Sequence, residues 1–351
     1  MSILRTNQKY QTYKPLKYEW AYLGYELLDA QRWHAKEVPV GGDVKDYYEL
    51  PESERKMVRN ILRLFTQNDV EALNGYSVLL PLVKPTEIKM YLSTATFTEV
   101  IHVDFYSNLT DTLGFSDEFY QEFLEIPVME RKIDYLEKAK VKRYEDYKAM
   151  GLTDAEVDIR FRQDVIKMVG VYAAGLEGIE LMAQFAMLLA WTKLGKFQGM
   201  GQGNTYSVLD ENIHQIFNTK LFLTLAEENS DVYTDEIRSD IRNAIIQISE
   251  QEMAMTDYLY DNGSHPVITR EQAKEFVKFM TDRALTMMEL APVYDISKNP
   301  IPFMDELLAN VEFANFFEVD VTAYSENILS GDWRGVQTDK VDFLKMKKGG
   351  Q

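Results

Sequence analysis

The chain has 351 residues, of which 46% are hydrophobic, and a formal net charge of −18. This length and apolar content allow a large buried core, whereas the acidic balance argues against nucleic acid or an anionic membrane as the main partner. The chain has no cysteine, which excludes disulfides, zinc–thiolate sites and cysteine nucleophiles.

Helical periodicity dominates the chain. Segments that alternate with period two are few and short, so the predicted fold class is all-α. Thr153, Thr234 and Thr269 are suited to cap the starts of three helices. The predicted helices, in chain order, are Leu16–Ala30, Glu52–Tyr76, Pro85–Gly114, Ser116–Glu125, Glu130–Met150, Thr153–Lys193, Thr205–Glu228, Thr234–Asp261 and Thr269–Ala291.

Neither a targeting signal nor a membrane span is predicted. Residues 1–15 are polar and lack the apolar centre of a signal peptide. The longest strongly apolar stretch, from Leu181 to Trp191, is shorter than the ~20 residues that a membrane-spanning helix needs. We therefore expect a soluble, cytoplasmic protein without a membrane partner.

Glycines mark two places in the second half of the chain. Gly170, Gly175 and Gly178 fall inside one predicted helix, where each costs up to ~1 kcal/mol relative to alanine. This cluster predicts close helix packing or a local distortion near a site. The run from Gly199 to Gly203 does not follow a strand, and we interpret it as an interhelix loop rather than a phosphate-binding loop.

Two segments have the pattern Glu-x-x-His, namely Glu99 to His102 and Glu211 to His214. Positions i and i+3 share one helix face, so each pair can offer a metal ion one carboxylate oxygen and one imidazole nitrogen. With 56 acidic residues in the chain, such a pair is not rare by itself. The apolar surroundings favour metal binding over hydrogen-bonded core polar groups, because buried unpaired charges are costly.

Two further predicted helices each carry one acid in apolar surroundings, Asp69 and Glu177. With the two pairs they make four carboxylates and two imidazoles, a ligand set suited to iron or manganese rather than to structural zinc. For the remaining histidines, His34 and His265, we favour positions at the surface or in support of the site.

Tyr106 lies four residues after His102, one helical turn further along the same face and roughly 6 Å along the axis. A tyrosine beside a high-potential metal pair can be oxidised to a radical. The other interpretation is an ordinary core tyrosine, which the spacing alone favours because the chain has 21 tyrosines. With only four histidines, a hydrolytic triad is not indicated.

The segments around these acids resemble those of a known family, the small subunit of class I ribonucleotide reductases. In order and approximate spacing they match the family's six-ligand pattern, and the resemblance extends from about Trp33 to Tyr324. It implies a ferritin-like helical bundle with additional helices, assembled as a homodimer. The matching segments are Phe65-Thr66-Gln67-Asn68-Asp69, Thr98-Glu99-Val100-Ile101-His102, Gly175-Leu176-Glu177-Gly178-Ile179 and Asp210-Glu211-Asn212-Ile213-His214.

The resemblance also implies the roles of individual residues. One metal ion would be bound by Asp69, Glu99 and His102, and the other by Glu177, Glu211 and His214. Tyr106 falls at the position of the family's radical tyrosine, which favours the radical interpretation. Phe185, two turns after Glu177, falls in the apolar pocket that shields that radical.

The family passes an oxidising equivalent over a long distance by proton-coupled electron transfer. By resemblance, Trp33 is the relay tryptophan, and Asp210 is the acid that links it to His102. Tyr324 matches the tail tyrosine that hands over to the large subunit. Residues 1–317 are then the di-metal helical domain, and residues 318–351, which lose the apolar rhythm, form a flexible tail that docks to that subunit.

The function that the resemblance implies is that of the radical-generating small subunit of ribonucleoside-diphosphate reductase, an oxidoreductase of deoxyribonucleotide synthesis. Because this chain has no cysteine, the thiol chemistry of ribonucleotide reduction would belong to the large subunit. The ligand set fits two iron ions, two manganese ions or one of each. One alternative is an R2-like di-metal ligand-binding oxidase that acts on a small apolar ligand without a large subunit. Another is a non-catalytic metal-storage bundle.

Overall fold

The computed structural model describes residues 2–5, 12 and 14–309, and the regular elements in these residues are all helical, so the predicted all-α class is confirmed. Tyr324 and the boundary predicted after residue 317 lie outside the described residues. The α-helices are α1 (Glu19–Ala30), α2 (Asp43–Glu49), α3 (Glu52–Leu79), α4 (Thr86–Thr112), α5 (Glu118–Gln121), α6 (Pro127–Ala139), α7 (Tyr144–Ala149), α8 (Asp154–Gly170), α9 (Met182–Thr192), α10 (Gln198–Glu228), α11 (Asp235–Asn262), α12 (Arg270–Met287) and α13 (Asp305–Ala309). Shorter elements are the 3₁₀ turns η1 (Ala35–Glu37), η2 (Val40–Gly42), η3 (Glu122–Glu125) and η5 (Pro302–Met304), and the π-helical segment η4 (Val171–Leu176).

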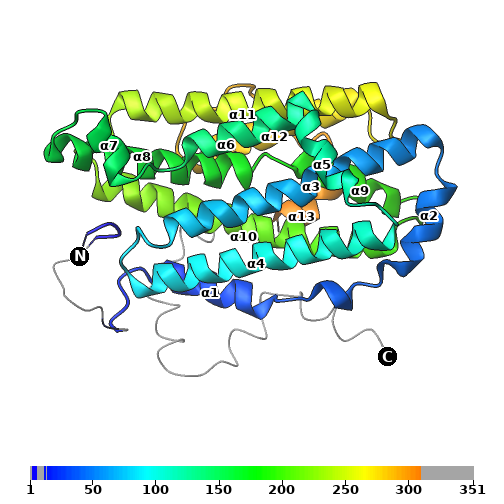
Figure 1. Ribbon diagram of the computed structural model, residues 1–351, viewed down its shortest axis with the longest axis horizontal. Coiled ribbons are helices and arrows are strands. Elements are labelled where there is room, and N and C mark those ends of the chain that lie inside the picture. Colours follow the sequence, from blue (N-terminus) through cyan, green and yellow to red (C-terminus); the bar gives the residue numbers. More distant parts are fainter. Residues whose placement is uncertain (1, 6–11, 13, 310–351) are drawn as a thin grey trace. The chain divides into compact units, whose positions relative to one another are not determined.

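The long helices α3, α4, α10 and α11 run lengthwise through the unit Met1–Leu308 (Figure 1). α3 packs against α4, α10 against α8 and α9, and α11 against α12, while α1 packs against α4. The inner face of α3 follows helical spacing, because Ile61, Phe65, Asp69 and Ala72 are all buried. Asp69 therefore lies in the apolar stripe and points toward the centre of the bundle.

The three predicted threonine caps are confirmed. The Oγ1 atom of Thr153 accepts the amide of Glu156 at 3.4 Å at the start of α8. Thr234 and Thr269 accept backbone amides three residues ahead in the same way, at 3.4 Å and 3.2 Å. Each cap satisfies an amide that has no partner inside its helix.

The helix predicted over Glu130–Met150 is wrong as a single element. α6 ends at Ala139, and α7 begins at Tyr144. Between them Lys140 and Arg143 have extended backbones, with ψ of 142° and 156°. Lys140 turns its ammonium group to the carboxylate of Glu71 at 3.3 Å. A mixed-charge surface pattern does not reveal such a break, because both short helices have polar outer faces.

The helix predicted over Thr153–Lys193 is also interrupted, as its glycine cluster indicated. α8 ends at Gly170, η4 follows, and α9 starts only after Leu181, whose φ is +64°. Gly175 lies against Ile248 so closely that a Cβ atom would come within 2.3 Å of Ile248 Cδ1. The predicted close packing and local distortion are therefore both present.

The interhelix loop predicted over Gly199–Gly203 is wrong, because α10 already begins at Gln198. The carboxylate of Asp43 accepts the amides of Gly199 and Met200, at 3.1 Å and 2.5 Å, and so satisfies the start of the helix. Gly203 has a packing role, since a Cβ atom there would come within 2.0 Å of the ring of Phe105 on α4. These glycines bring α10 close to its neighbours.

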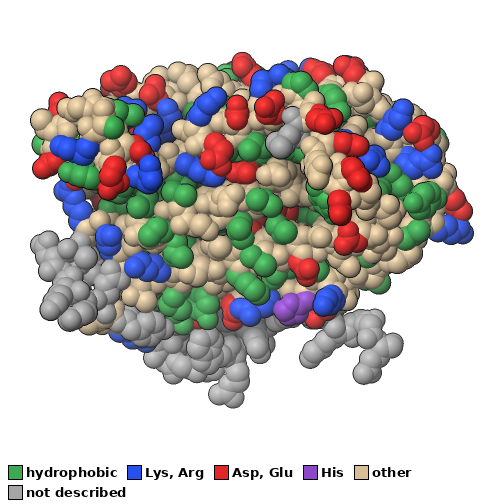
Figure 2. Space-filling view, viewed as in Figure 1, with side chains coloured by type: hydrophobic (Ala, Val, Ile, Leu, Met, Phe, Trp, Pro, Cys, Tyr) green, Lys and Arg blue, Asp and Glu red, His purple; other side chains and the backbone are tan. Residues whose placement is uncertain are grey.

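In the described part of the chain, none of the helices combines the length and the apolar character that crossing a membrane requires. Figure 2 shows acidic and basic side chains interspersed on the face in view, with hydrophobic side chains between them. The net negative charge thus does not gather in one patch on this face.

Candidate metal centre

Three helices and the turn that follows η4 supply the six predicted ligands. Asp69 lies on α3, Glu99 and His102 on α4, Glu177 directly after η4, and Glu211 and His214 on α10. Each is at most 6% exposed. The i, i+3 spacing places the members of each Glu-x-x-His pair on one inward face of their helix.

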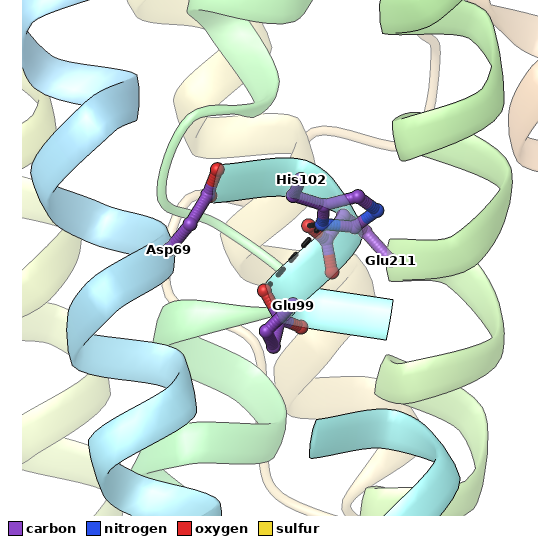
Figure 3. A group of neighbouring side chains, drawn as sticks. All are labelled: Asp69, Glu99, His102 and Glu211. Atoms are coloured by element: carbon purple, nitrogen blue, oxygen red, sulfur yellow. Dashed lines mark ion pairs between the residues drawn. The ribbon is translucent and has the colours of Figure 1, made fainter. Parts of the chain in front are cut away.

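The ring atom Nδ1 of each histidine points into the group of carboxylates. Nδ1 of His102 lies 3.4 Å from Glu99 and 3.3 Å from Glu211 (Figure 3). Nδ1 of His214 lies 3.0 Å from Glu99, 3.0 Å from Glu211 and 3.5 Å from Glu177. The carboxylates of Glu99 and Glu211 thus lie between the two imidazoles.

Two overlapping groups of ligand atoms result, each with its atoms within 4.8 Å of one another. One is Asp69, Glu99, His102 and Glu211, and the other is Glu99, Glu177, Glu211 and His214. The resemblance assigned Glu99 and Glu211 to one ion each. In the structure both acids belong to both groups of ligand atoms.

The donor set fits two cations. Asp69 Oδ2, both oxygens of Glu99 and Nδ1 of His102 are buried without a hydrogen-bond partner. Burial, together with the charges of Glu99, Glu211 and Glu177, raises the pKa of Asp69 well above its usual value. Burial and the Glu211 charge raise the pKa of Glu177 to about 7. These acids need compensating positive charge, which protons or metal ions can supply.

A neighbouring pair of buried acids is neutralised in a different way, by a lysine. Glu180 lies beside the ligand group, and Glu180 and the buried Glu252 both contact the fully buried ammonium group of Lys132. The ion-pair partners of Glu99, Glu177 and Glu211 in the described part of the chain are instead the two imidazoles. The negative charge that no lysine or arginine balances is therefore concentrated in the six-residue group.

The irregular segment η4 positions Glu177. The Glu177 amide bonds to the carbonyl of Tyr172 at 3.0 Å, five residues back, as in a π turn. Together with Leu181 and Phe185, Glu177 lines a cavity of about 10 Å³, space for about one water, which the other three acids also border. π turns of this kind occur frequently at functional sites.

Tyr106 is fully buried beside the ligand group. Its hydroxyl donates to Asn204 Oδ1 at 2.7 Å, and burial raises its pKa well above the usual value, so the phenol stays protonated. The rings of Phe65 and Phe105 lie 4.8 Å and 4.9 Å from its ring. Phe185 lies one ring further out, 4.6 Å from Phe65.

A hydrogen-bonded line runs from the ligand group to Trp33. His102 Nε2 lies 3.1 Å from Asp210 Oδ2, and Trp33 Nε1 donates to the same oxygen at 2.9 Å. Gln31 donates to the other oxygen of Asp210 at 2.5 Å. Asp210 thus orients both rings and directs Nδ1 of His102 toward the carboxylates.

A family model described as "Ribonucleotide reductase, small chain" matches residues 11–300. The chain belongs to this family. A relative in Invertebrate iridescent virus 3, described as a probable ribonucleoside-diphosphate reductase small subunit, is 31% identical over 92% of this chain and 86% of its own length. The ribonucleoside-diphosphate reductase subunit beta of Chlamydia pneumoniae is 29% identical over 88% of each chain.

Solved structures show the same fold. The ribonucleotide reductase R2 subunit from Clostridium botulinum matches with a TM-score of 0.75 at 21% identity, over 88% of this chain and 94% of that one. The dimanganese(II)-NrdF of Streptococcus sanguinis matches with a TM-score of 0.70 at 17% identity, over 86% of this chain and 100% of that one. An R2-like ligand-binding oxidase with a Mn/Fe cofactor matches with a TM-score of 0.61 at 16% identity, over 78% of this chain and 94% of that one. The ferritin-like bundle predicted for this ribonucleotide reductase small chain is thereby confirmed.

The two remaining histidines lie away from the ligand group. His34 is exposed. The Nε2 atom of His265 donates to the carbonyl of Met187 at 3.0 Å, while Nδ1 accepts the amides of Val267 and Ile268. Burial lowers the pKa of His265 to about 4, so the ring stays neutral as a loop support.

The sequence interpretation missed two residues of this centre, Tyr76 and Asn204. Each lies seven residues from a ligand on its own helix, Tyr76 after Asp69 and Asn204 before Glu211. Seven residues are about two turns, so both share the ligand's helix face. That spacing was a readable signal, but many residues share such a face with a ligand, and spacing does not select among them.

Proposed function

We propose that this ribonucleotide reductase small chain is the radical-generating subunit of ribonucleoside-diphosphate reductase. The observation that best supports the proposal is the continuity of its parts. A buried group of four acids and two histidines is joined through Asp210 to the buried ring of Trp33, and Tyr106 lies beside it. A purely structural polar cluster would not need an aromatic side chain at the end of such a line.

The six residues Asp69, Glu99, His102, Glu177, Glu211 and His214 would hold two ions of iron, of manganese or one of each. When bound, these ions supply oxygen activation and a strong one-electron oxidant. The residues around them exclude water, since Tyr106, Phe65 and Phe185 are all at most 1% exposed. A radical on Tyr106 or at the metal pair would be protected by that apolar wall.

The relay is assigned to this chain's own side chains. Asp210 holds the Nε1 proton of Trp33 and faces His102, so the tryptophan can lose an electron while its proton has an acceptor nearby. Tyr324 would then carry the equivalent onward from the tail. The final step belongs to a large subunit, because this chain has no cysteine for thiol chemistry.

We further propose a homodimer. Phe97 and Val100 lie three residues apart on α4 and are 43% and 45% exposed. Exposed apolar neighbours on one helix face are typical of surfaces that are covered in an assembly.

The decisive experiment joins metal analysis to electron paramagnetic resonance on protein activated in air with iron and, separately, with manganese. We expect about two metal ions per chain and a tyrosyl signal that Tyr106→Phe abolishes while metal content stays unchanged. Two metals with only a coupled cluster signal would remove Tyr106 from the mechanism. Absence of stoichiometric metal would overturn the proposed site.

A ligand-binding oxidase on the same fold is the alternative. It requires neither a large subunit nor Tyr324. Deoxyribonucleotide formation that depends on adding the large subunit supports the proposal, whereas oxidation of an apolar ligand by this chain alone supports the alternative.

A further inference from the structure

Tyr76 makes a direct hydrogen bond to one of the proposed ligands. It lies on α3, is 2% exposed, and its hydroxyl donates to Glu177 Oε1 at 2.5 Å. No step of the proposed function uses this side chain.

Two further side chains determine where the Tyr76 proton points. The hydroxyl of Tyr91 on α4 donates to Asn218 Oδ1 at 3.0 Å. The amide Nδ2 of Asn218 on α10 then donates to the hydroxyl oxygen of Tyr76 at 2.7 Å. Because that oxygen accepts from Asn218, its own proton is directed to Glu177. All three side chains are buried, so water does not compete with this line.

The other three acids of the group have no comparable restraint among the described residues. Both oxygens of Glu99 and the Oδ2 atom of Asp69 lack a hydrogen-bond partner, and the ion-pair contacts of Glu99 are with the two imidazoles inside the group. Glu211 Oε2 faces His214 Nδ1 at 3.0 Å, inside the group itself. Glu177 is the acid with one oxygen, Oε1, held from outside, while Oε2 lies 3.5 Å from His214 Nδ1.

The backbone around Glu177 makes such a restraint consequential. Glu177 follows η4, and Leu181 has a φ of +64°, so no regular helix surrounds this residue. It also borders the cavity of about 10 Å³ beside the group. A carboxylate on irregular backbone beside a cavity has room to turn unless another group holds it.

We propose that Tyr76 is a positioning residue that limits Glu177 to offering one oxygen, Oε2, to the ion held with His214. The His214 half of the centre thereby differs from the His102 half, whose acids are not restrained in this way. This inference rests on the proposed two-metal site. It concerns how that site is made asymmetric.

The test is anaerobic titration of the full chain with manganese(II). Calorimetry measures the binding affinities, and electron paramagnetic resonance records the spectrum of the bound form. Tyr76→Phe removes the hydroxyl and keeps the ring. The freed carboxylate keeps its charge, loses the hydroxyl that stabilised it and can offer both oxygens, so we expect one of the two ions to bind about three- to ten-fold more tightly, the equivalent of one hydrogen bond. The spectrum of the dimanganese form should change as well.

Tyr172→Phe is the matched control. Tyr172 is also buried in this region, but its hydroxyl has no hydrogen-bond partner. This variant should therefore match the wild-type affinity and spectrum. Asn218→Ala keeps Tyr76 and removes the amide that directs its proton, so it should shift the affinity in the same direction by less. It also serves as the test if Tyr76→Phe does not fold.

The outcomes separate the two proposals. If wild type and variants all fail to bind about two manganese ions, the two-metal function is wrong. If all bind two ions with equal affinities and identical spectra, the function stands and the role of Tyr76 is wrong. Weaker binding in Tyr76→Phe would equally contradict the inference.

Discussion

At the scale of single residues, Asp210 joins two rings that lie far apart in the chain. Its Oδ2 atom meets both His102 Nε2 and Trp33 Nε1, and Gln31 holds its other oxygen. Trp33 is 4% exposed and packs against the rings of Phe105 and Tyr206. Burial and three hydrogen bonds therefore hold Asp210 and Trp33 in place beside the ligand group.

Trp33→Phe tests whether this line carries the oxidising equivalent. Phenylalanine retains an aromatic ring but has no N–H to donate to Asp210. We expect metal content and the tyrosyl signal to remain, while deoxyribonucleotide formation with the large subunit falls to background. Trp191→Phe is the control, because Trp191 is fully buried but packs against His265, away from the ligand group. Wild-type turnover in Trp33→Phe would exclude this relay.

At the scale of elements, the distance between α4 and α10 decides whether the two Glu-x-x-His pairs meet. Gly203 on α10 lies against the ring of Phe105 on α4, with no space for a Cβ atom. Phe105 in turn contacts both Tyr106 and Trp33. One missing side chain thus allows the close approach of two helices that carry four of the six ligands.

Gly203→Ala should destabilise the protein although alanine favours helices. Helix propensity alone would stabilise by up to ~1 kcal/mol, but a Cβ atom 2.0 Å from a buried ring forces the helices apart, at a cost of about 1–3 kcal/mol. We expect a lower melting temperature and weaker metal binding. Gly42→Ala is the control, because Gly42 has a φ of −68° and no atom near its added Cβ. A melting temperature raised in both variants would contradict this account.

At the scale of the whole molecule, the centre is a concentration of acid that the fold tolerates only with added positive charge. Four buried carboxylates meet at two imidazoles, and the Lys132 ammonium serves the neighbouring pair instead. Metal binding is therefore expected to contribute to folding stability as well as to chemistry.

Removal of metal by a chelator should lower the free energy of unfolding, by ~3 kcal/mol where the free metal had been at a hundred times its Kd.

The pKa of Glu177 rises from 4.5 to about 7 in the folded chain. The metal-free fold thus favours the protonated acid, and its stability should fall as pH rises from 4.5 to about 7. Added metal should restore more stability at the upper end of this window. Urea unfolding with and without manganese across that range measures both effects, and a metal contribution that does not grow with pH would argue against competition between protons and metal.

Much of the fold was predictable because its signals are local. Apolar spacing and the caps at Thr153, Thr234 and Thr269 located long helices, and the glycines near Gly175 indicated the break at η4. The division between α6 and α7 and the start of α10 were missed. Both depend on distant partners, Glu71 for Lys140 and Asp43 for the amides of Gly199 and Met200.

By itself, the sequence determined the all-α class and the helices that carry five of the six candidate ligands, because periodicity and i, i+3 spacing are written within one segment. Only the tertiary structure decided that Glu99 and Glu211 belong to both groups of ligand atoms and that Tyr76 bonds to Glu177, 101 residues away. The physical reason is that contacts between helices depend on how closely the helices approach and how each is rotated. Contacts such as that of Gly203 with Phe105 set this geometry, and no single segment contains both partners.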